Sequence, residues 1–314
     1  MRNILMEELS SSNEGVLLVS YTNRAIDEIC SKLVEEGLDF LRISSPNACP
    51  PSYQTYLLNE RAKRCVSIKE VEELLLNTRI VVGTSTSLTN SLQIFSLRSF
   101  GLAIIDEASQ ILEPQLLGLL CACHKGKEAI KRFVMIGDHK QLPAVVQQEA
   151  CDSVVKDEGL RSLGLEDCRE SLFQRLLRIN DNPSLVFHFR HQGRMHPEVA
   201  RFANETFYEG ILDPVPLPHQ KRTLQFETVD ADNPFQKALS THRLLFIPSY
   251  QPKERVLPKA NLVEAELIAE TVKAVYDLYC QNNMKFEANE TIGVIVPYRH
   301  QIALVRNLLL QNRV

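Results

Sequence analysis

The stretch LAIIDEASQ, from Leu102 to Gln110, is an apolar run that stops abruptly at two adjacent acids, Asp106 and Glu107. A short run of this composition is typical of a strand that is buried on both faces. Two neighbouring carboxylates repel each other, so they must be hydrated, paired or bound to a cation. The stretch therefore predicts a buried strand that ends either in a solvated turn or in a site for a divalent metal and an activated water.

Four further apolar runs surround this stretch and alternate with helical patterns along the chain. Each run is short, rich in Val, Ile and Leu, and followed by polar residues. Such strands alternating with helices predict an α/β domain in which helices cover both faces of a parallel sheet. Ligands of these sheets gather at the carboxyl ends of the strands. The additional strands are predicted at residues 15–22, 39–44, 79–85 and 132–138.

The length of 314 residues predicts about two domains, on the basis of roughly 150 residues per domain. We expect the first domain at residues 1–182, with an insertion or small subdomain at about 45–78, where a loop and a charged helix interrupt the strands. The second domain is expected at residues 183–314, with an incomplete sheet. Its predicted strands are 184–189, 242–248 and 290–298, and its predicted helices are 196–208, 261–281 and one that begins at 299.

The composition is that of an ordinary soluble globular protein, with 44% hydrophobic and 24% charged residues. No apolar run reaches the ~18 residues of a membrane span, and the first residues do not form a secretory signal. The eight cysteines are scattered without zinc spacing, which favours reduced thiols in an intracellular protein, cytoplasmic or nuclear. With a net charge of −4, a nucleic-acid partner would need a local basic surface.

The stretch GDHKQLPA, from Gly137 to Ala144, repeats the arrangement of the acidic stretch one strand later. Asp138 ends the predicted strand, and Gln141 follows within reach of the same rim. Gly137 permits a sharp turn of the backbone, and a glutamine beside a terminal phosphate can orient water or sense the nucleotide. Each stretch alone is compatible with a solvated strand end, but the two together favour a site for phosphoryl transfer.

The stretch RHQGRMHPE, from Arg190 to Glu198, opens the second domain with a cluster of basic and polar groups. An arginine brought from a second domain, here Arg194, can stabilise the charge on a transferring phosphoryl group, as an arginine finger does. The structural alternative is a basic flank of a surface helix, and that interpretation would be favoured if the segment stood alone.

These segments together resemble the superfamily 1 helicases, in particular their up-frameshift-like group. LLVSYTNRAIDEI resembles motif Ia, VVGTSTSL motif Ic, IIDEASQ motif II and MIGDHKQLPAV motif III, while GRMHPEVARFANETFYEGIL and IGVIVPYRHQ resemble two segments of the second helicase domain. The six matches occur in the family's order and span about residues 16–310. The resemblance implies an α/β fold of two RecA-like domains with parallel sheets, both incomplete here, and ATP bound between them.

The resemblance also implies roles for individual residues. Asp106 would hold Mg²⁺ through water and Glu107 would be the catalytic base. Gln141 would contact the γ-phosphate of ATP, and Arg194 would be the arginine finger. The nucleotide site would also include Gly137, Asp138 and Gln192. The backbone of single-stranded DNA or RNA would contact Thr22, Asn23, Thr84, Ser85, Pro297, Tyr298 and Arg299.

The chain departs from the family pattern in three places. It contains no G-x-x-x-x-G-K-[ST] string, the P-loop that cradles phosphates, and it ends before the family's last motifs. Gly193 stands where the family usually has a tyrosine. We therefore expect the middle portion of an ATP- and magnesium-dependent helicase or translocase, with negligible ATPase activity by itself. The alternative is a non-catalytic RecA-like module that binds nucleic acid or a protein.

Overall fold

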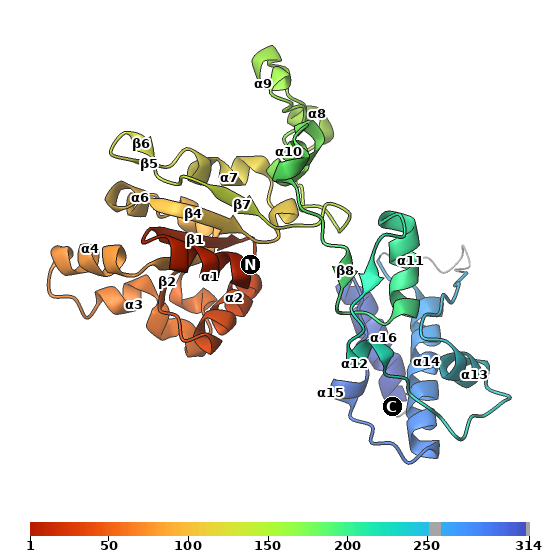
Figure 1. Cartoon of the computed structure of the whole chain (residues 1–314). Coiled ribbons are helices and arrows are strands. Elements are labelled where there is room, and N and C mark those ends of the chain that lie inside the picture. The colour runs from red at the N-terminus through yellow and green to blue at the C-terminus, as the bar shows by residue number, and fades with distance from the viewer. Residues whose placement is uncertain (251–258, 312–314) are drawn as a thin grey trace. The chain divides into compact units, whose positions relative to one another are not determined.

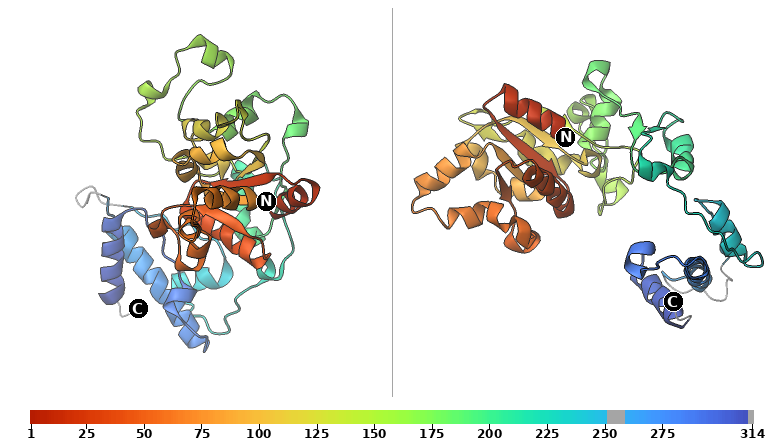
Figure 2. Two further views of the ribbon diagram at one scale, coloured as in Figure 1. Left: turned by 90° about the vertical axis from the view of Figure 1, so that its left-hand side faces the viewer. Right: turned by 60° about the horizontal axis from the view of Figure 1, so that its bottom comes forward.

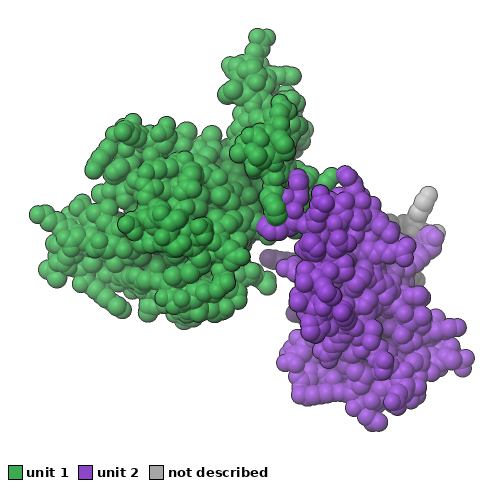
Figure 3. All heavy atoms as spheres, in the orientation of Figure 1, with its two compact units in different colours: residues 1–187 green, residues 188–314 purple. Residues whose placement is uncertain are grey.

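A computed structural model describes residues 1–250 and 259–311 of the chain (Figure 1). The contacts divide the chain into two compact units, Met1–Phe187 (unit 1) and His188–Val314 (unit 2), which Figure 3 colours separately. Both large clusters of buried hydrophobic residues among the described residues lie in unit 1. Unit 1 is therefore the part of the chain that has an extensive core.

A five-stranded parallel sheet forms the centre of unit 1, in the order β2-β3-β1-β4-β7. All five strands lie within the ranges predicted from the sequence or within two residues of them, and the predicted α/β fold with a parallel sheet is confirmed. The central strand is paired on both sides, with Leu18 opposite Val82 of one neighbour and Ile104 of the other. The strands are β1 (Gly15–Ser20), β2 (Phe40–Ile43), β3 (Ile80–Thr84), β4 (Phe100–Ile105) and β7 (Phe133–Met135).

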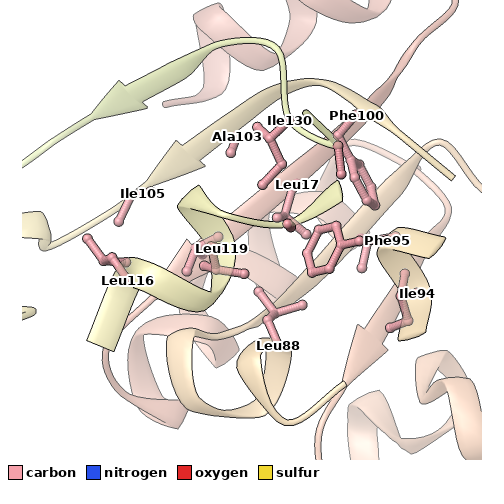
Figure 4. Close-up of a cluster of buried hydrophobic side chains, with 14 of the residues drawn as sticks. Leu17, Leu88, Ile94, Phe95, Phe100, Ala103, Ile105, Leu116, Leu119 and Ile130 are labelled. Atoms are coloured by element: carbon pink, nitrogen blue, oxygen red, sulfur yellow. The ribbon is translucent and has the colours of Figure 1, made fainter. Parts of the chain in front are cut away.

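Side chains of β1 alternate between two hydrophobic clusters, one on each face of the sheet. Leu17 belongs to the cluster beneath the helices that follow β3 and β4, where it lies near Phe95 and Leu119 (Figure 4). Leu18 belongs to the opposite cluster, together with Leu5. Every residue of β1 to β4 is buried, because helices cover both faces. These helices are α1 (Arg2–Ser11), α2 (Asn23–Glu35), α5 (Ser85–Thr89), α6 (Gln93–Leu97) and α7 (Glu113–Leu120).

Residues 45–78, where the sequence predicts an insertion, form a run of short helices after β2. Tyr56 stacks on Phe40 with ring centroids 4.2 Å apart, and Leu57 forms a bridge to Arg42 of β2. These contacts hold the segment against the outer edge of the sheet. The elements are η1 (Pro46–Ala48), η2 (Pro51–Tyr56), α3 (Leu58–Ala62) and α4 (Ile68–Asn77).

The remainder of unit 1 follows α7 as a small hairpin, the strand β7 and an arm. The arm projects from the sheet in Figure 1 and in the left view of Figure 2. Arg175 anchors the base of the arm through a bidentate ion pair with Glu113 of α7, with distances of 2.6 and 2.7 Å. The hairpin consists of β5 (Cys123–His124) and β6 (Lys127–Glu128), and the arm contains α8 (Ala150–Ser153), α9 (Glu158–Ser162) and α10 (Leu172–Ile179).

Unit 2 is mainly helical in the described residues. The predicted helices at 196–208, 261–281 and from 299 are confirmed as α11 (Pro197–Phe207), α14 (Leu262–Gln281) and α16 (Arg299–Gln311), and α14 packs against α16. The shorter elements of unit 2 are β8 (His191–Gln192), β9 (Asp213–Pro214), α12 (Pro218–Lys221), α13 (Pro234–Thr241) and α15 (Ala288–Thr291). The last element of unit 1, just before them in the chain, is η4 (Pro183–Leu185).

The strands predicted at 184–189, 242–248 and 290–298 are wrong, because the structure forms no strand in these ranges. In the described part of unit 2, the only strands are the two-residue pair β8 and β9, which are parallel. Phe246 is 90% exposed and Ile295 is 98% exposed. A strand-forming sequence becomes a strand only when a neighbouring strand and a packing surface are present, and these segments have neither.

No helix in the described ranges is both long enough and apolar enough to cross a lipid bilayer.

Candidate functional site

The two adjacent acids lie at the carboxyl end of β4, on a turn that is tied to both neighbouring strands. The Asp106 amide donates a hydrogen bond to the carbonyl oxygen of Val19 in β1 at 2.8 Å. The Ala108 amide donates to the carbonyl oxygen of Ile136, which follows β7, also at 2.8 Å. The backbone that carries Asp106 and Glu107 is therefore held on both sides by the sheet.

Glu107 has a left-handed backbone conformation, with φ 52° and ψ 39°. Residues other than glycine adopt this region uncommonly, and such strained positions cluster at functional sites. Its carboxylate accepts a hydrogen bond from Nε2 of Gln110 at 3.1 Å, across the short helix η3 (Ala108–Gln110). The left-handed residue thus forms the junction between β4 and η3, directly beside Asp106.

Burial raises the pKa of the Asp106 carboxyl above its ordinary value, and a hydrogen bond from the backbone amide of Glu107 lowers it in part. Asp106 also lines a cavity of about 460 Å³ that is bounded by α1, α2 and β1. A bidentate ion pair between Arg2 and Glu36, at 2.6 and 3.0 Å, joins the two helices beside this cavity. A cation beside this half-buried carboxylate would favour its charged form.

The second motif packs directly against the first. A Cβ atom at Gly137 would lie 2.9 Å from the amide nitrogen of Ser109 and 3.3 Å from that of Ala108. The position therefore needs glycine for the close approach of two backbones. We predicted that glycine is needed at this position for a sharp turn of the backbone. A turn does not explain the requirement, because Gly137 is not among the residues with positive φ. The contact brings the strand end after β7 against the turn after β4.

Asp138 and Gln141 are joined within the same loop. Oδ1 of Asp138 accepts a hydrogen bond from the Lys140 amide at 3.0 Å, and Oδ2 accepts one from Nε2 of Gln141 at 3.1 Å. The Asp138 amide donates to Oγ of Ser109 at 3.2 Å. Ser109 was not predicted as a site residue, although its position in the DEAS string could have indicated a role at the site. The carboxylate of Asp138 thus shapes the loop that carries Gln141.

Two of the four residues expected to contact nucleic acid in unit 1 lie on the surface. Thr22 is the N-cap of α2, and its hydroxyl accepts a hydrogen bond from the Ala25 amide at 3.2 Å. Thr22 and Asn23 are exposed at the carboxyl end of β1. Thr84 and Ser85, at the carboxyl end of β3, are buried instead. Within unit 1, only the end of β1 therefore presents its predicted contact residues to a ligand.

Thr84 and Ser85 serve the fold in different ways. Oγ1 of Thr84 accepts a hydrogen bond from the Ser87 amide at 3.1 Å, as the N-cap of α5. Oγ of Ser85 is buried and has no hydrogen-bond partner among the described residues, and the same is true of Ser20 at the end of β1. Ser20 and Thr84 are register partners in the sheet. The carboxyl ends of β1 and β3 thus hold two buried hydroxyl groups without a partner.

In unit 2, the side chain of Gln192 closes the turn that carries Arg194. Its Oε1 accepts hydrogen bonds from the amides of Arg194, at 3.1 Å, and Met195, at 2.8 Å, and its Nε2 donates to the Met195 carbonyl oxygen at 2.8 Å. Arg194 is exposed, and the described residues make no hydrogen bond or ion pair with its guanidinium group. Gln192 therefore shapes this turn through its own side chain.

Pro297 and Tyr298 lie in the exposed segment that leads into α16, and Arg299 is the exposed first residue of that helix, so none of them ends a strand. Nζ of Lys259 lies 5.9 Å from the centre of the Tyr298 ring, in a cation–π arrangement. This segment offers an aromatic ring and a cation close together, which are groups that contact single-stranded nucleic acid.

Comparison with known proteins finds two family models, both described as AAA domain, that match residues 58–149 and 168–314. The chain is 30% identical to the DNA replication ATP-dependent helicase/nuclease DNA2 of Bos taurus, over 99% of the chain and 28% of that protein. It is 32% identical to the Xenopus laevis protein of the same name, over 96% of the chain and 28% of that protein. It is 26% identical to the Saccharomyces cerevisiae protein of that name, over 98% of the chain and 19% of that protein.

The chain thus spans less than a third of the length of these relatives. The matches run through both units of the chain, and unit 1 has the parallel α/β sheet of a RecA-like P-loop NTPase domain, with the DEAS and GDHKQLP segments in contact at its carboxyl edge. The chain belongs to the superfamily 1 helicases, in their up-frameshift-like group.

Proposed function

We propose that the chain is the core portion of an ATP-dependent helicase or translocase that moves along single-stranded nucleic acid. The observation that carries the proposal is the contact between the two motifs at the sheet edge, where the Asp138 amide bonds to Oγ of Ser109 at 3.2 Å. This contact brings Asp106 and Glu107 to the same rim as the loop of Gln141. A phosphoryl-transfer site needs such an assembly of carboxylates and polar groups.

The residues of the rim fit a magnesium ion. Carboxylate oxygens are its usual protein ligands, and Mg²⁺ is commonly held by one or two carboxylates together with water and substrate phosphates. Asp106 supplies a half-buried carboxylate on a rigid turn. The described residues contain no group of three or more His, Cys, Asp or Glu side chains that would hold a metal by itself. Magnesium at Asp106 would neutralise phosphate charge.

The chain does not contain the string that would cradle the phosphates of ATP. We therefore assign roles only to groups that it does contain. Glu107 accepts a proton from the attacking water, Gln141 contacts the terminal phosphate, and Arg194 offsets the charge that develops on it. Gly137, Asp138 and Gln192 shape the backbone that carries these groups, as their hydrogen bonds and close contacts indicate.

The proposed nucleic acid is single-stranded DNA, because the relatives are named as DNA replication helicase/nucleases. Thr22 and Asn23 are exposed at the start of α2, where backbone amides and the helix dipole favour phosphate oxygens. In unit 2, the exposed residues Pro297, Tyr298 and Arg299 supply the remaining contacts. Thr84 and Ser85 contribute through the fold, because their side chains are buried.

The experiment that tests the proposal compares the chain with its Glu107→Gln variant, each fused at its amino terminus to a strand and P-loop segment, because the chain by itself should hydrolyse ATP negligibly. Binding of a fluorescent single-stranded DNA oligonucleotide is measured by anisotropy, and ATP hydrolysis is measured with and without Mg²⁺. We expect salt-sensitive DNA binding in both proteins, and magnesium-dependent hydrolysis only in the chain with Glu107. DNA binding without hydrolysis in either protein would support the non-catalytic module. Neither binding nor hydrolysis would overturn both functions.

A further inference from the structure

The turn that carries Arg194 rests on a segment for which the sequence indicates no function. This segment is residues 215–220, between β9 and the end of α12. The Val215 amide donates a hydrogen bond to the carbonyl oxygen of Gln192 at 3.0 Å. Nε2 of His219 lies 2.8 Å from the carbonyl oxygen of Gly193. The backbone on the amino-terminal side of Arg194 is therefore held at two points.

Gln220 holds the turn on both sides of Arg194 at once. Its Nε2 donates hydrogen bonds to the carbonyl oxygen of Gln192 at 2.9 Å and to that of Met195 at 3.0 Å. Its Oε1 accepts a hydrogen bond from the Leu217 amide at 3.2 Å. Gln220 is only 1% exposed, so these bonds do not compete with water.

Both hydrogens of one amide group are thus used to fix the separation between residues 192 and 195. The side chain of Gln192 closes the same four residues from the other direction, since it also bonds to the carbonyl oxygen of Met195. Arg194 is exposed at this turn while the residues that flank it are anchored. Such an arrangement fixes the Cα–Cβ direction of Arg194, which limits the region that its side chain can reach and contributes to preorganised charge stabilisation.

We propose that Gln220 is a positioning residue that fixes the turn from which Arg194 extends, so that Arg194 can stabilise the charge of a transferring phosphoryl group. The proposal rests on the function proposed above for Arg194. Gln220 does not contact the reacting atoms, and it acts through the turn of residues 192–195. Its amide donors are the essential feature, because the two groups that they bind are both backbone carbonyl oxygens.

The variant Gln220→Glu isolates these donors. Glutamate has the same shape and keeps an oxygen for the Leu217 amide, but it places a carboxylate oxygen against two carbonyl oxygens. The matched control is Gln236→Glu in α13. Gln236 is also 1% exposed, and its Oε1 also accepts a backbone hydrogen bond, from the Asp230 amide at 2.9 Å. The control therefore reproduces the burial of a charge in unit 2 without touching the Arg194 turn.

The test measures kcat and KM for ATP with magnesium and single-stranded DNA, in four variants of the same P-loop fusion. These are Gln220→Glu, Gln236→Glu, Arg194→Ala and the double variant Gln220→Glu with Arg194→Ala. We expect Gln220→Glu to lower kcat by about tenfold to 100-fold while KM stays within about twofold. In the Arg194→Ala background the same substitution produces no further loss, since Gln220 acts only through Arg194. Gln236→Glu leaves kcat unchanged.

A second measurement follows the turn without hydrolysis. The ¹⁵N relaxation of the Arg194 and Met195 amides, and of Nε of Arg194, reports motion on the picosecond to nanosecond scale. We expect increased motion in Gln220→Glu and none in Gln236→Glu. An unchanged kcat in Gln220→Glu, with a lowered kcat in Arg194→Ala, would overturn the proposal and leave the helicase function standing.

The failure of the proposed function gives a different pattern. In that case the P-loop fusion does not hydrolyse ATP, or its Arg194→Ala variant hydrolyses ATP at the original rate, and Arg194 has no catalytic role. The relaxation measurement then still decides the role of Gln220, because rigid Arg194 and Met195 amides in Gln220→Glu would refute the clamp independently of any chemistry.

Discussion

The backbone amide of Asp138 donates a hydrogen bond to the hydroxyl oxygen of Ser109 at 3.2 Å, and this bond joins the ends of two parallel strands, β4 and β7. It lies where Gly137 approaches the same serine closely enough to exclude a side chain. The two segments that the sequence singled out as acidic strand ends are therefore one structural unit. Its disruption is expected to affect stability and activity together.

Gly137→Ala tests the close approach. The new Cβ atom would lie 2.9 Å from a backbone nitrogen, which cannot move aside as a flexible side chain can. We expect a loss of about 1–3 kcal/mol in the free energy of unfolding, as for other overpacked sites. Chemical denaturation measures the loss. The control is Gly293→Ala, where no heavy atom lies within 4 Å of the new Cβ. Equal stability of the two variants would contradict this packing.

Ser109→Ala tests the hydrogen bond itself. The substitution leaves the Asp138 amide without its acceptor, and such a loss costs about 0.5–1.5 kcal/mol. Hydrogen exchange of the Asp138 amide is the direct measurement, and we expect it to accelerate. Ser96→Ala removes an exposed hydroxyl that donates to the Gln93 carbonyl oxygen, and it should leave the Asp138 amide unaffected. Exchange at the original rate in Ser109→Ala would show that the bond is not formed.

Arg175→Met tests the anchor of the arm on α7. The variant leaves the carboxylate of Glu113 largely buried and without its ion-pair partner, so we expect a loss of about 3 kcal/mol in the free energy of unfolding. Arg24→Met, in the exposed Arg24–Glu28 pair of α2, should cost less than about 1 kcal/mol. Thermal and urea unfolding of both variants measure the difference. Losses of similar size would mean that the Arg175 pair is solvated.

Cys30 provides a test of the core through its thiol. Burial raises the pKa of Cys30 to about 12, while Cys121, Cys123, Cys151 and Cys280 are exposed. At pH 8 we expect a thiol reagent to label the exposed cysteines first and Cys30 only after unfolding, as peptide mass spectrometry would show. The thiol has a lower pKa in the unfolded chain, so it loses its proton more readily there. The free energy of unfolding therefore falls as the pH rises above the ordinary pKa of cysteine. Rapid labelling of Cys30 in the folded chain would contradict its burial in the core of unit 1.

The sequence alone was sufficient to predict the strands of the unit 1 sheet and the polar residues at its carboxyl edge. The five strands are short apolar runs, and their local composition already requires burial on both faces. The acids at Asp106, Glu107 and Asp138 end these runs, and parallel pairing brings such ends to one edge. The long helices of unit 2 were also predictable, because an apolar period of 3.6 residues is a local property.

Only the tertiary structure decided which strands are neighbours and which side chains the neighbours cover. Parallel pairing joins residues far apart in the chain, such as Val16 and Ile80, and no local pattern encodes that choice. Local sequence likewise does not encode the burial of Ser85 or the hydrogen bonds of Gln220 to the Arg194 turn. Conversely, strand-like sequence around Phe246 and Ile295 stayed unpaired. Propensity acts within a few residues, whereas a sheet or a clamp depends on partners that only the folded chain brings into contact.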